Sequence, residues 1–319
     1  MESTIQLDTL KQAVEQIKNN IGQVIVGQEK MVELMIAALL AKGHVLVEGV
    51  PGVAKTLTAK LLAKSMDVPF SRIQFTPDLM PTDIIGTSVY LPQDGSFRFK
   101  RGPIFSQVVL IDEINRSPAK TQAALFEVME ERQISYDGTT YPMQAPFFVL
   151  ATQNPIEQEG TYRLPEAQLD RFLFKIEVGY PSLEEEVGIL HKTQSGVTAD
   201  LGAVTAVLSA SQVIDAQNIA GQIHIEDKVL QYIAALVCET RNNKSLYLGA
   251  SPRASVAVLN SSKAIAAMRG RDFVTPDDIV YILPAVLGHR IILTPEKEME
   301  GGTSGQVIRE IVNKVEVPR

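Results

Sequence analysis

Residues 44–66 constrain the fold most strongly, because they read as a strand, a glycine-containing turn and a helix in immediate succession. Residues 44–48 (HVLVE) are mostly apolar, the turn carries Gly49 and Gly52, and residues 55–66 have the composition of a helix. Such a unit gathers the backbone N–H groups of the turn and of the helix start at one point, where they bind anions. The segment therefore predicts a parallel α/β architecture with a phosphate-binding loop.

The turn, GVPGVAKT at residues 49–56, follows the phosphate-loop pattern with one departure, since Ala54 stands where a glycine is usual. We expect Ala54 to have a helical φ, where a Cβ costs nothing. The Lys55 ammonium would lie at the β and γ phosphates of ATP, and the Thr56 hydroxyl would coordinate Mg²⁺. The residues predicted to bind the nucleotide here are Gly49, Val50, Pro51, Gly52, Val53, Ala54, Lys55, Thr56 and Leu57.

Two further apolar runs end in polar residues suited to the same site. Residues 108–111 (VVLI) precede Asp112 and Glu113, and residues 147–151 precede a short polar stretch that contains Asn154. Ligands bind at the carboxyl ends of the strands in open α/β sheets, so these side chains are expected near the loop. Asp112 is a candidate Mg²⁺ ligand, Glu113 a candidate for polarising the attacking water, and Asn154 for orienting that water or contacting the γ-phosphate.

Two arginines complete the candidate catalytic set. Arg171 precedes the last predicted strand of the α/β part, from where it could reach a nucleotide on a neighbouring subunit. Arg253 follows Ser-Pro at a predicted helix start, where a cation opposes the helix dipole and needs a compensating anion. A γ-phosphate or a nearby carboxylate would serve as that anion.

The strand and helix patterns change near residue 180. Before it, strands and helices alternate, which predicts an ATP-binding α/β core at residues 1–180 with a parallel sheet flanked by helices. After it, capping-box and Ser/Thr-Pro signals start successive helices, which predicts an all-α lid domain at residues 181–319. Asp-Gly turns at residues 94–95 and 137–138 predict two hairpins. These are either surface ribbons or projections toward a partner or a pore.

At this point the sequence resembles the MoxR family of AAA+ ATPases. Four stretches carry the resemblance: VEGVPGVAKT at 47–56, LIDEINRSPAKTQAALFEVMEERQIS at 110–135, ATQNPIEQEGTYRLPEAQLDRF at 151–172 and GASPRA at 249–254. The second and third stretches are long enough to be highly specific. Arg163 stands where relatives usually have proline, and we expect its side chain to lie in solvent.

The resemblance implies roles for the residues of the core. Lys55 and Thr56 correspond to the Walker A lysine and threonine, Asp112 and Glu113 to the Walker B pair, and Asn154 to sensor 1. It also implies an AAA+ P-loop fold that binds ATP and Mg²⁺.

For the remaining residues, the resemblance makes Arg171 an arginine finger and Arg253 a sensor 2, acting in cis or in trans. Val26 and Gly27 match the segment that lines the adenine pocket. Residues 76–101 would be the insert in the second helix that defines one AAA+ clade, and residues 132–145 the hairpin before sensor 1. Members form rings, usually hexamers, and act in chaperone-like maturation or metal insertion, often with a partner that carries a von Willebrand factor A domain.

Composition limits the classes of partner that the chain can bind and the cellular compartment in which it is expected. The net charge of −7 argues against general nucleic-acid binding, and the longest apolar run, residues 34–41, is too short to cross a bilayer. No secretory signal is visible. The single cysteine, Cys238, lies in an apolar run and is predicted to be buried, which together with the lack of a disulfide favours a reducing, cytoplasmic location.

Several functions remain open beside ring-driven remodelling of partner proteins. A nucleotide-gated scaffold without turnover and a magnesium-chelatase-like motor subunit would share the same architecture. A DNA-remodelling motor is disfavoured by the acidic balance, and a small-molecule kinase by the lack of any recognisable acceptor pocket.

Overall fold

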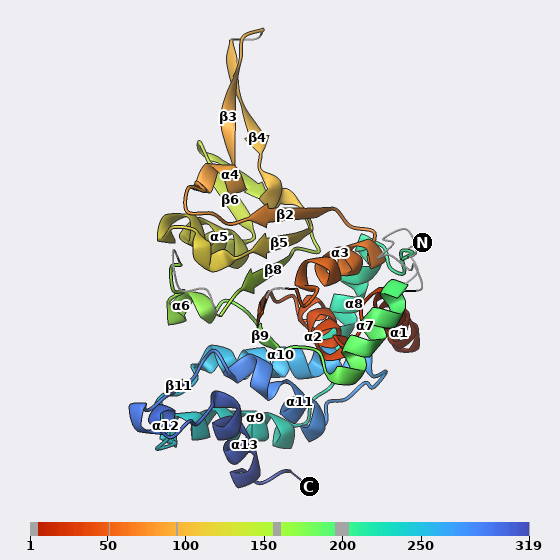
Figure 1. Ribbon diagram of the computed structural model, residues 1–319, viewed down its shortest axis with the longest axis vertical. Coiled ribbons are helices and arrows are strands. Elements are labelled where there is room, and N and C mark those ends of the chain that lie inside the picture. Colours follow the sequence, from red (N-terminus) through yellow and green to blue (C-terminus); the bar gives the residue numbers. More distant parts are fainter. Residues whose placement is uncertain (1–5, 51, 94, 156–160, 195–203, 319) are drawn as a thin grey trace.

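A five-stranded parallel sheet forms the centre of the molecule (Figure 1). The structure, a computed structural model, describes residues 6–318 apart from 51, 94, 156–160 and 195–203. The sheet order is β2-β5-β8-β1-β9, and all neighbours run parallel. The strands are β1 (Val45–Gly49), β2 (Phe70–Gln74), β5 (Val108–Asp112), β8 (Phe148–Gln153) and β9 (Phe174–Val178). The predicted α/β fold is thus confirmed.

Alternate residues of the strands point into two separate cores, as the pleat of a sheet requires. On one face, side chains such as Val45 and Val47 pack against α1 (Leu7–Val24), α2 (Glu29–Leu40) and α3 (Lys55–Ser65). On the other face, side chains such as Leu46 belong to a second core, which is covered by helix α5 (Ala119–Glu131) and by several shorter elements. The shorter elements are α4 (Pro81–Ile85), the 3₁₀ turns Pro103–Phe105 and Ile114–Arg116, and α6 (Glu166–Leu169).

The second half of the chain is a helical lid region, as predicted. The Ser182 capping box forms as the sequence indicates, with the Glu185 N–H donating to the Ser182 hydroxyl and the Ser182 N–H to the Glu185 carboxylate. A short antiparallel sheet in this region was not predicted. The elements are α7 (Leu183–Gln194), α8 (Ala210–Gln222), α9 (Asp227–Asn242), β10 (Leu246–Leu248), α10 (Pro252–Met268), α11 (Pro276–Leu287), β11 (Ile292–Leu293), α12 (Pro295–Met299) and α13 (Ser304–Lys314).

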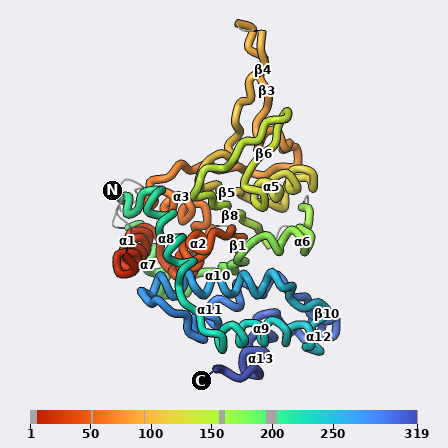
Figure 2. The backbone as a smooth tube through the Cα atoms, turned by 180° about the vertical axis from the view of Figure 1, so that it is seen from behind, coloured from red at the N-terminus to blue at the C-terminus, as the bar shows by residue number. Residues whose placement is uncertain are grey.

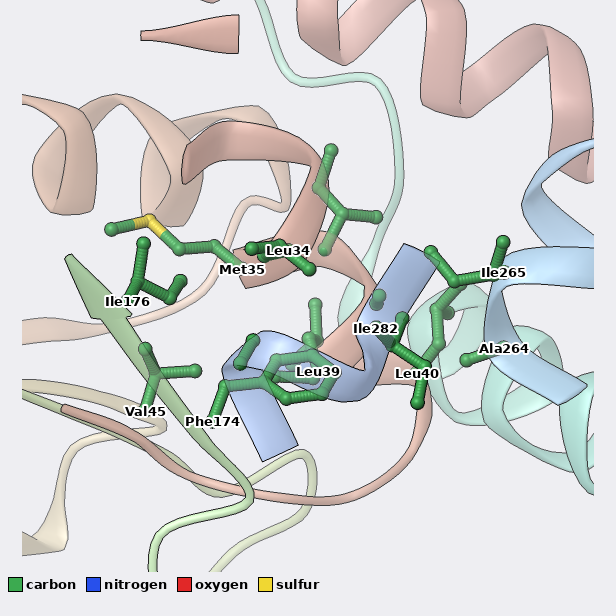
Figure 3. Close-up of a cluster of buried hydrophobic side chains, with 14 of the residues drawn as sticks. Leu34, Met35, Leu39, Leu40, Val45, Phe174, Ile176, Ala264, Ile265 and Ile282 are labelled. Carbon is green, nitrogen blue, oxygen red and sulfur yellow. The ribbon is translucent and has the colours of Figure 1, made fainter. Parts of the chain in front are cut away.

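Helix α2 joins the sheet and the lid region into one continuous core. In Figure 3 its side chains lie between strands β1 and β9 on one side and helices α10 and α11 on the other. Seen from behind, α10 and α11 lie directly below the sheet and its helices (Figure 2). Most of α2 is apolar, including all of residues 34–40, because this part is covered on both sides. The lid region therefore packs against the core through a large apolar contact.

Two hairpins lie on the side of the sheet away from the lid. The longer one, β3 (Gly86–Leu91) with β4 (Ser96–Arg101), projects well beyond the rest of the molecule (Figure 1). The other joins β6 (Gln133–Tyr136) to β7 (Thr139–Pro142), and Asp137 and Gly138 both have positive φ, as the predicted turn requires. Of the first predicted turn, Gly95 also has positive φ, whereas Asp94 is outside the described residues.

Aromatic stacking fixes the base of the long hairpin. The Phe99 ring stacks on Tyr141 at 4.6 Å and lies 4.8 Å from Tyr136. Toward the tip, Tyr90 and Phe97 contact each other but are otherwise exposed.

The prediction of a buried thiol at Cys238 is wrong, because this side chain is exposed. The buried face of α9 follows the helical period through Ile233, Leu236, Val237 and Thr240, and Cys238 points away from it. Within the described part of the chain, none of the helices combines the length and apolar character needed to span a bilayer.

Candidate functional site: a nucleotide cleft at the sheet edge

The phosphate loop follows β1 at the carboxyl edge of the sheet. Strand β1 lies between β8 and β9, so the loop opens where chain connections leave in opposite directions, the usual place for a ligand in such sheets. A Cβ at Gly49 would lie 2.6 Å from the Val178 carbonyl oxygen, so only glycine lets the chain leave β1 here. Pro51 is outside the described residues.

The expectation of a helical φ at Ala54 is wrong. Ala54 is the N-cap of α3 with φ 59° and ψ 18°, in the left-handed region, and Gly52 also has positive φ. Alternating the handedness of the backbone in this way turns successive N–H groups toward the inside of the loop, which makes an anion-binding concavity. The left-handed conformation of an alanine costs about 1 kcal/mol, so this loop holds local strain.

Lys55, the first residue of α3, lies at the mouth of this loop. Its ammonium donates a hydrogen bond to the Gly49 carbonyl oxygen, which folds the side chain back over the loop. Burial lowers the pKa of Lys55, while Asp112, Glu113 and Glu48 act in the opposite direction. The three carboxylates thus favour the charged form of the ammonium.

Thr56 and Asp112 meet at the point predicted for the metal. The Thr56 hydroxyl donates to Asp112 Oδ2 at 3.3 Å, and Asp112 itself is buried. The other carboxylate oxygen, Oδ1, accepts a hydrogen bond of 2.8 Å from the Thr152 hydroxyl on the neighbouring strand β8. Thr152 thus fixes the orientation of the carboxylate.

Glu113 has a strained backbone directly after β5. Its φ of 57° is left-handed, and its N–H donates to the Thr152 hydroxyl at 3.0 Å. The side-chain oxygen Oε2 accepts from Gln74 Nε2 at 2.8 Å and lies 3.0 Å from Arg116 Nε. A non-glycine residue in this conformation costs about 1 kcal/mol or more and is typical of functional positions.

Sequence reasoning missed the two residues of β2 that face these acids. Arg72 Nε donates to Asp112 Oδ2 at 2.7 Å, and Arg72 Nη2 donates to Gln74 Oε1 at 3.0 Å. Strand β2 pairs with β5 in register, with Gln74 opposite Asp112. The sequence signal for them was a polar pair at alternating positions of this strand.

An apolar cavity of about 250 Å³ adjoins the loop and has the character of an adenine pocket. Val26, Val53, Ala54 and Leu57 line it, so the structure brings Val26 to the loop as expected. Gly27 lines two neighbouring cavities instead, with a φ of 78°, and a Cβ at this position would clash with the Glu185 side chain. The far wall, which sequence reasoning missed, comes from the start of the lid region: Pro181, Ile189, Lys192 and Thr193.

The three remaining candidate catalytic residues lie at two different positions in the structure. Asn154 is buried directly after β8, the strand that carries Thr152. Arg171 and Arg253 instead meet at Glu130 of α5, with Arg171 Nε 3.6 Å from Oε2 and Arg253 Nη2 3.3 Å from Oε1. A carboxylate is therefore the anion that compensates Arg253 in this chain.

Arg163 lies in solvent, as expected. Its side chain is 89% exposed, and its Nη2 is 3.7 Å from the Glu166 carboxylate.

Comparison with known proteins also indicates an ATPase. Residues 44–174 match the model of the ATPase family associated with various cellular activities (AAA), and residues 238–311 match the AAA lid domain. The first region contains the phosphate loop, Asp112, Glu113, Asn154 and Arg171, and the second contains Arg253.

Similar proteins extend along almost the whole chain. YeaC of Bacillus subtilis, an uncharacterized protein, is 46% identical over 94% of this chain and 93% of its own length. The chaperone MoxR1 of Mycobacterium tuberculosis is 45% identical over 98% of this chain and 84% of its own length. The crystal structure of a proposed ATPase from Cytophaga hutchinsonii superposes with a TM-score of 0.90 at 41% identity, covering 98% of this chain and 97% of that one. The chain is therefore an ATPase that belongs to the MoxR family of AAA proteins.

Proposed function

We propose that this ATPase binds Mg·ATP at residues 49–57, hydrolyses it at the junctions of a homo-oligomeric ring, and uses the cycle to remodel partner proteins. The observation that carries the proposal is the contact between the Thr56 hydroxyl and Asp112 Oδ2 beside the ammonium of Lys55. A hydroxyl, a carboxylate and a lysine at the start of a helix form the combination that holds a metal-bound triphosphate.

The oxygen donors suit Mg²⁺. Among the described residues, no group of three or more His, Cys, Asp or Glu side chains could enclose an ion. Thr56 and Asp112 supply two hard oxygen donors, so most ligands would come from phosphate and water, which is the coordination that Mg²⁺ prefers. When bound there, Mg²⁺ would neutralise part of the phosphate charge. Arg72 holds the same Asp112 oxygen and would have to share or release it.

Three protein side chains have the other catalytic roles. Lys55 stabilises charge on the phosphates, and Glu113 orients and polarises the attacking water. Glu113 is held in place for this by Gln74 and by its own N–H bond to Thr152. Asn154 contributes an uncharged amide beside the γ-phosphate, where an acid would add repulsion.

Arg171 and Arg253 would act on the nucleotide of the neighbouring subunit. Both side chains converge on Glu130 rather than on the group formed by Lys55, Thr56 and Asp112. In a ring, a phosphate of the next subunit would compete with Glu130 for the two guanidinium groups. AAA proteins are typically oligomeric, and a hexamer is the arrangement that we propose.

The division into domains follows from the same cleft. We propose a core at residues 1–180 and a lid domain at 181–319, with Pro181 and Ile189 of the second closing the adenine pocket of the first. Residues 76–101 would be the clade-defining insert and residues 132–145 the hairpin before sensor 1.

The partner is proposed to be a protein. The relative MoxR1 is named a chaperone, and we extend that role to this chain, with a cytoplasmic location and a client that carries a von Willebrand factor A domain. The net charge of −7 supports a protein rather than a nucleic-acid partner.

Steady-state phosphate release from Glu113→Gln and Arg171→Ala tests the proposal. Each change should lower kcat by about 10³-fold or more, whereas the exposed Arg163→Ala serves as a matched arginine control that retains wild-type turnover. Wild-type turnover in both active-site variants would remove the mechanism. Nucleotide binding without phosphate release by the wild type would favour the nucleotide-gated scaffold. Phosphate release that requires a porphyrin substrate would favour the magnesium-chelatase-like motor subunit.

A further inference from the structure

We infer that Arg290 is a positioning residue for Arg171, through which the lid region of each subunit sets the arginine that the subunit offers to its neighbour. The inference rests on the proposed function, in which Arg171 acts in trans. Arg290 lies just after α11 in the lid region, whereas Arg171 lies before β9 in the core. Neither the sequence pattern nor the catalytic roles above make use of Arg290.

The guanidinium of Arg290 is buried and makes five hydrogen bonds. One goes to the carbonyl oxygen of Val286 on the preceding helix α11, and the other four cross to the core. Nε donates to Asp170 Oδ1 at 2.7 Å, and Nη2 donates to the carbonyl oxygens of Asp170 at 3.0 Å and Phe172 at 2.7 Å. Nη1 donates to the carbonyl oxygen of Leu173 at 3.1 Å. All five N–H donors of an arginine are thus in use.

These bonds hold the backbone on both sides of Arg171. Asp170 precedes it and Phe172 follows it, and the Phe172 carbonyl oxygen also contacts His289 Nε2 at 3.0 Å. The Phe172 ring is fully buried against Phe126 of α5, with centroids 5.7 Å apart. The lid residues Arg290 and His289 thus hold both neighbours of Arg171, together with the core contact between Phe172 and Phe126.

The chemistry of the contact explains why an arginine is used. Four carbonyl oxygens and one carboxylate oxygen converge on the guanidinium, and an apolar side chain would remove all five of these hydrogen bonds. Burial lowers the pKa of Arg290, and the hydrogen bond and charge of Asp170 oppose that change. The guanidinium is planar, so its hydrogen bonds fix the orientation of the Arg171 backbone relative to the lid region as well as the distance between them.

The consequence is a mechanical connection between nucleotide state and the neighbouring site. The lid region forms part of the adenine pocket through Pro181 and Ile189, and it holds the backbone around Arg171 through Arg290. A shift of α11 relative to the sheet therefore moves both flanks of Arg171 together. The nucleotide of one subunit would in this way set the placement of the arginine at the next junction.

A subunit-mixing experiment tests this inference with the full-length chain. Arg290→Met misplaces Arg171 but retains the phosphate loop, and Lys55→Ala loses the loop lysine but presents a native Arg171. Alone, each variant should show at least about 10-fold lower kcat. Mixed in equal amounts, they should recover roughly a quarter of wild-type turnover, because half of the subunits have an intact loop and half of those meet a native neighbour.

Two further variants keep the result interpretable. Asp170→Asn removes the carboxylate partner of Arg290 with little change in shape, and it should show a smaller loss of kcat that the same mixing restores. Arg271→Met is the matched control, because the Arg271 guanidinium donates to the lid residues Phe273, Thr275 and Asp278 and, among the described residues, to none of the core. It should retain the kcat of the wild type.

The outcomes separate the inference from the proposed function. Recovery in the Arg290→Met mixture supports the inference, and wild-type turnover of Arg290→Met alone overturns it. If Arg171→Ala recovers with Lys55→Ala but Arg290→Met does not, the loss of Arg290 impairs the nucleotide site of its own subunit, and the inference is wrong. If the Arg171→Ala mixture also fails to recover, the trans arrangement in the proposed function is wrong, and the inference falls with it.

Discussion

Thr152 provides the sharpest test of the site geometry. Its hydroxyl donates to Asp112 Oδ1 at 2.8 Å and accepts from the Glu113 N–H at 3.0 Å, in a buried position. Thr152→Val keeps the shape and removes both bonds. A hydrogen bond to a carboxylate contributes about 2 kcal/mol, and leaving a buried N–H without a partner costs a further 1 kcal/mol or so. We expect the free energy of unfolding to fall by about 3 kcal/mol.

Thr152→Ser is the matched control, since it keeps the hydroxyl and loses only a methyl group, which costs about 1 kcal/mol. Urea unfolding followed by circular dichroism would measure both variants. Thr152→Val should be less stable than Thr152→Ser by about 2 kcal/mol. It should also lose kcat by about 10-fold or more, because Asp112 and Glu113 are no longer oriented by the same hydroxyl. Equal stability of the two variants would refute this reasoning.

Two other predictions concern groups outside the catalytic set. Burial and the nearby Arg132 lower the pKa of His44 from 6.5 to about 4, so the unfolded chain takes up the proton first. The stability from His44 is complete above about pH 6.5 and is lost as the pH falls toward 4, by about 2 kcal/mol between pH 7 and pH 5. Urea titrations of His44→Gln should show a pH dependence shallower by that amount, and an unchanged slope would contradict the assignment. At the long hairpin, Phe99→Ala should lower the unfolding free energy by about 2 kcal/mol because its ring stacks on Tyr141, whereas the exposed Phe97→Ala should cost about 0.5 kcal/mol or less. Equal losses in the two variants would show that the stack contributes nothing.

The sequence predicted those parts of the fold that depend on local pattern. The buried strands appear as apolar runs, and their polar ends place Asp112, Glu113 and Asn154 at one edge of a parallel sheet. Helix starts at Ser251 and Thr275 are also encoded locally, by a cap residue followed by proline. Such signals need no knowledge of distant contacts.

The features that were missed depend on contacts between distant segments or on the backbone conformation that the site imposes. Ala54 is left-handed because the loop has to turn its N–H groups inward, which overrides the preference of alanine. Arg72 reaches Asp112, and Arg290 reaches Asp170, across strand and domain contacts with no sequence spacing to reveal them. Cys238 was misplaced because the apolar run was considered without its helical period.

The central claim is that the loop at residues 49–56, with Lys55, holds the triphosphate. Isothermal titration of ATP with Mg²⁺ into the wild type and into Lys55→Ala tests it most directly, with Lys60→Ala on the same helix as the control. The wild type and Lys60→Ala should bind alike, and Lys55→Ala should bind at least about 10-fold more weakly, because an ammonium–phosphate contact is lost. Equal binding by Lys55→Ala and the wild type would contradict the account.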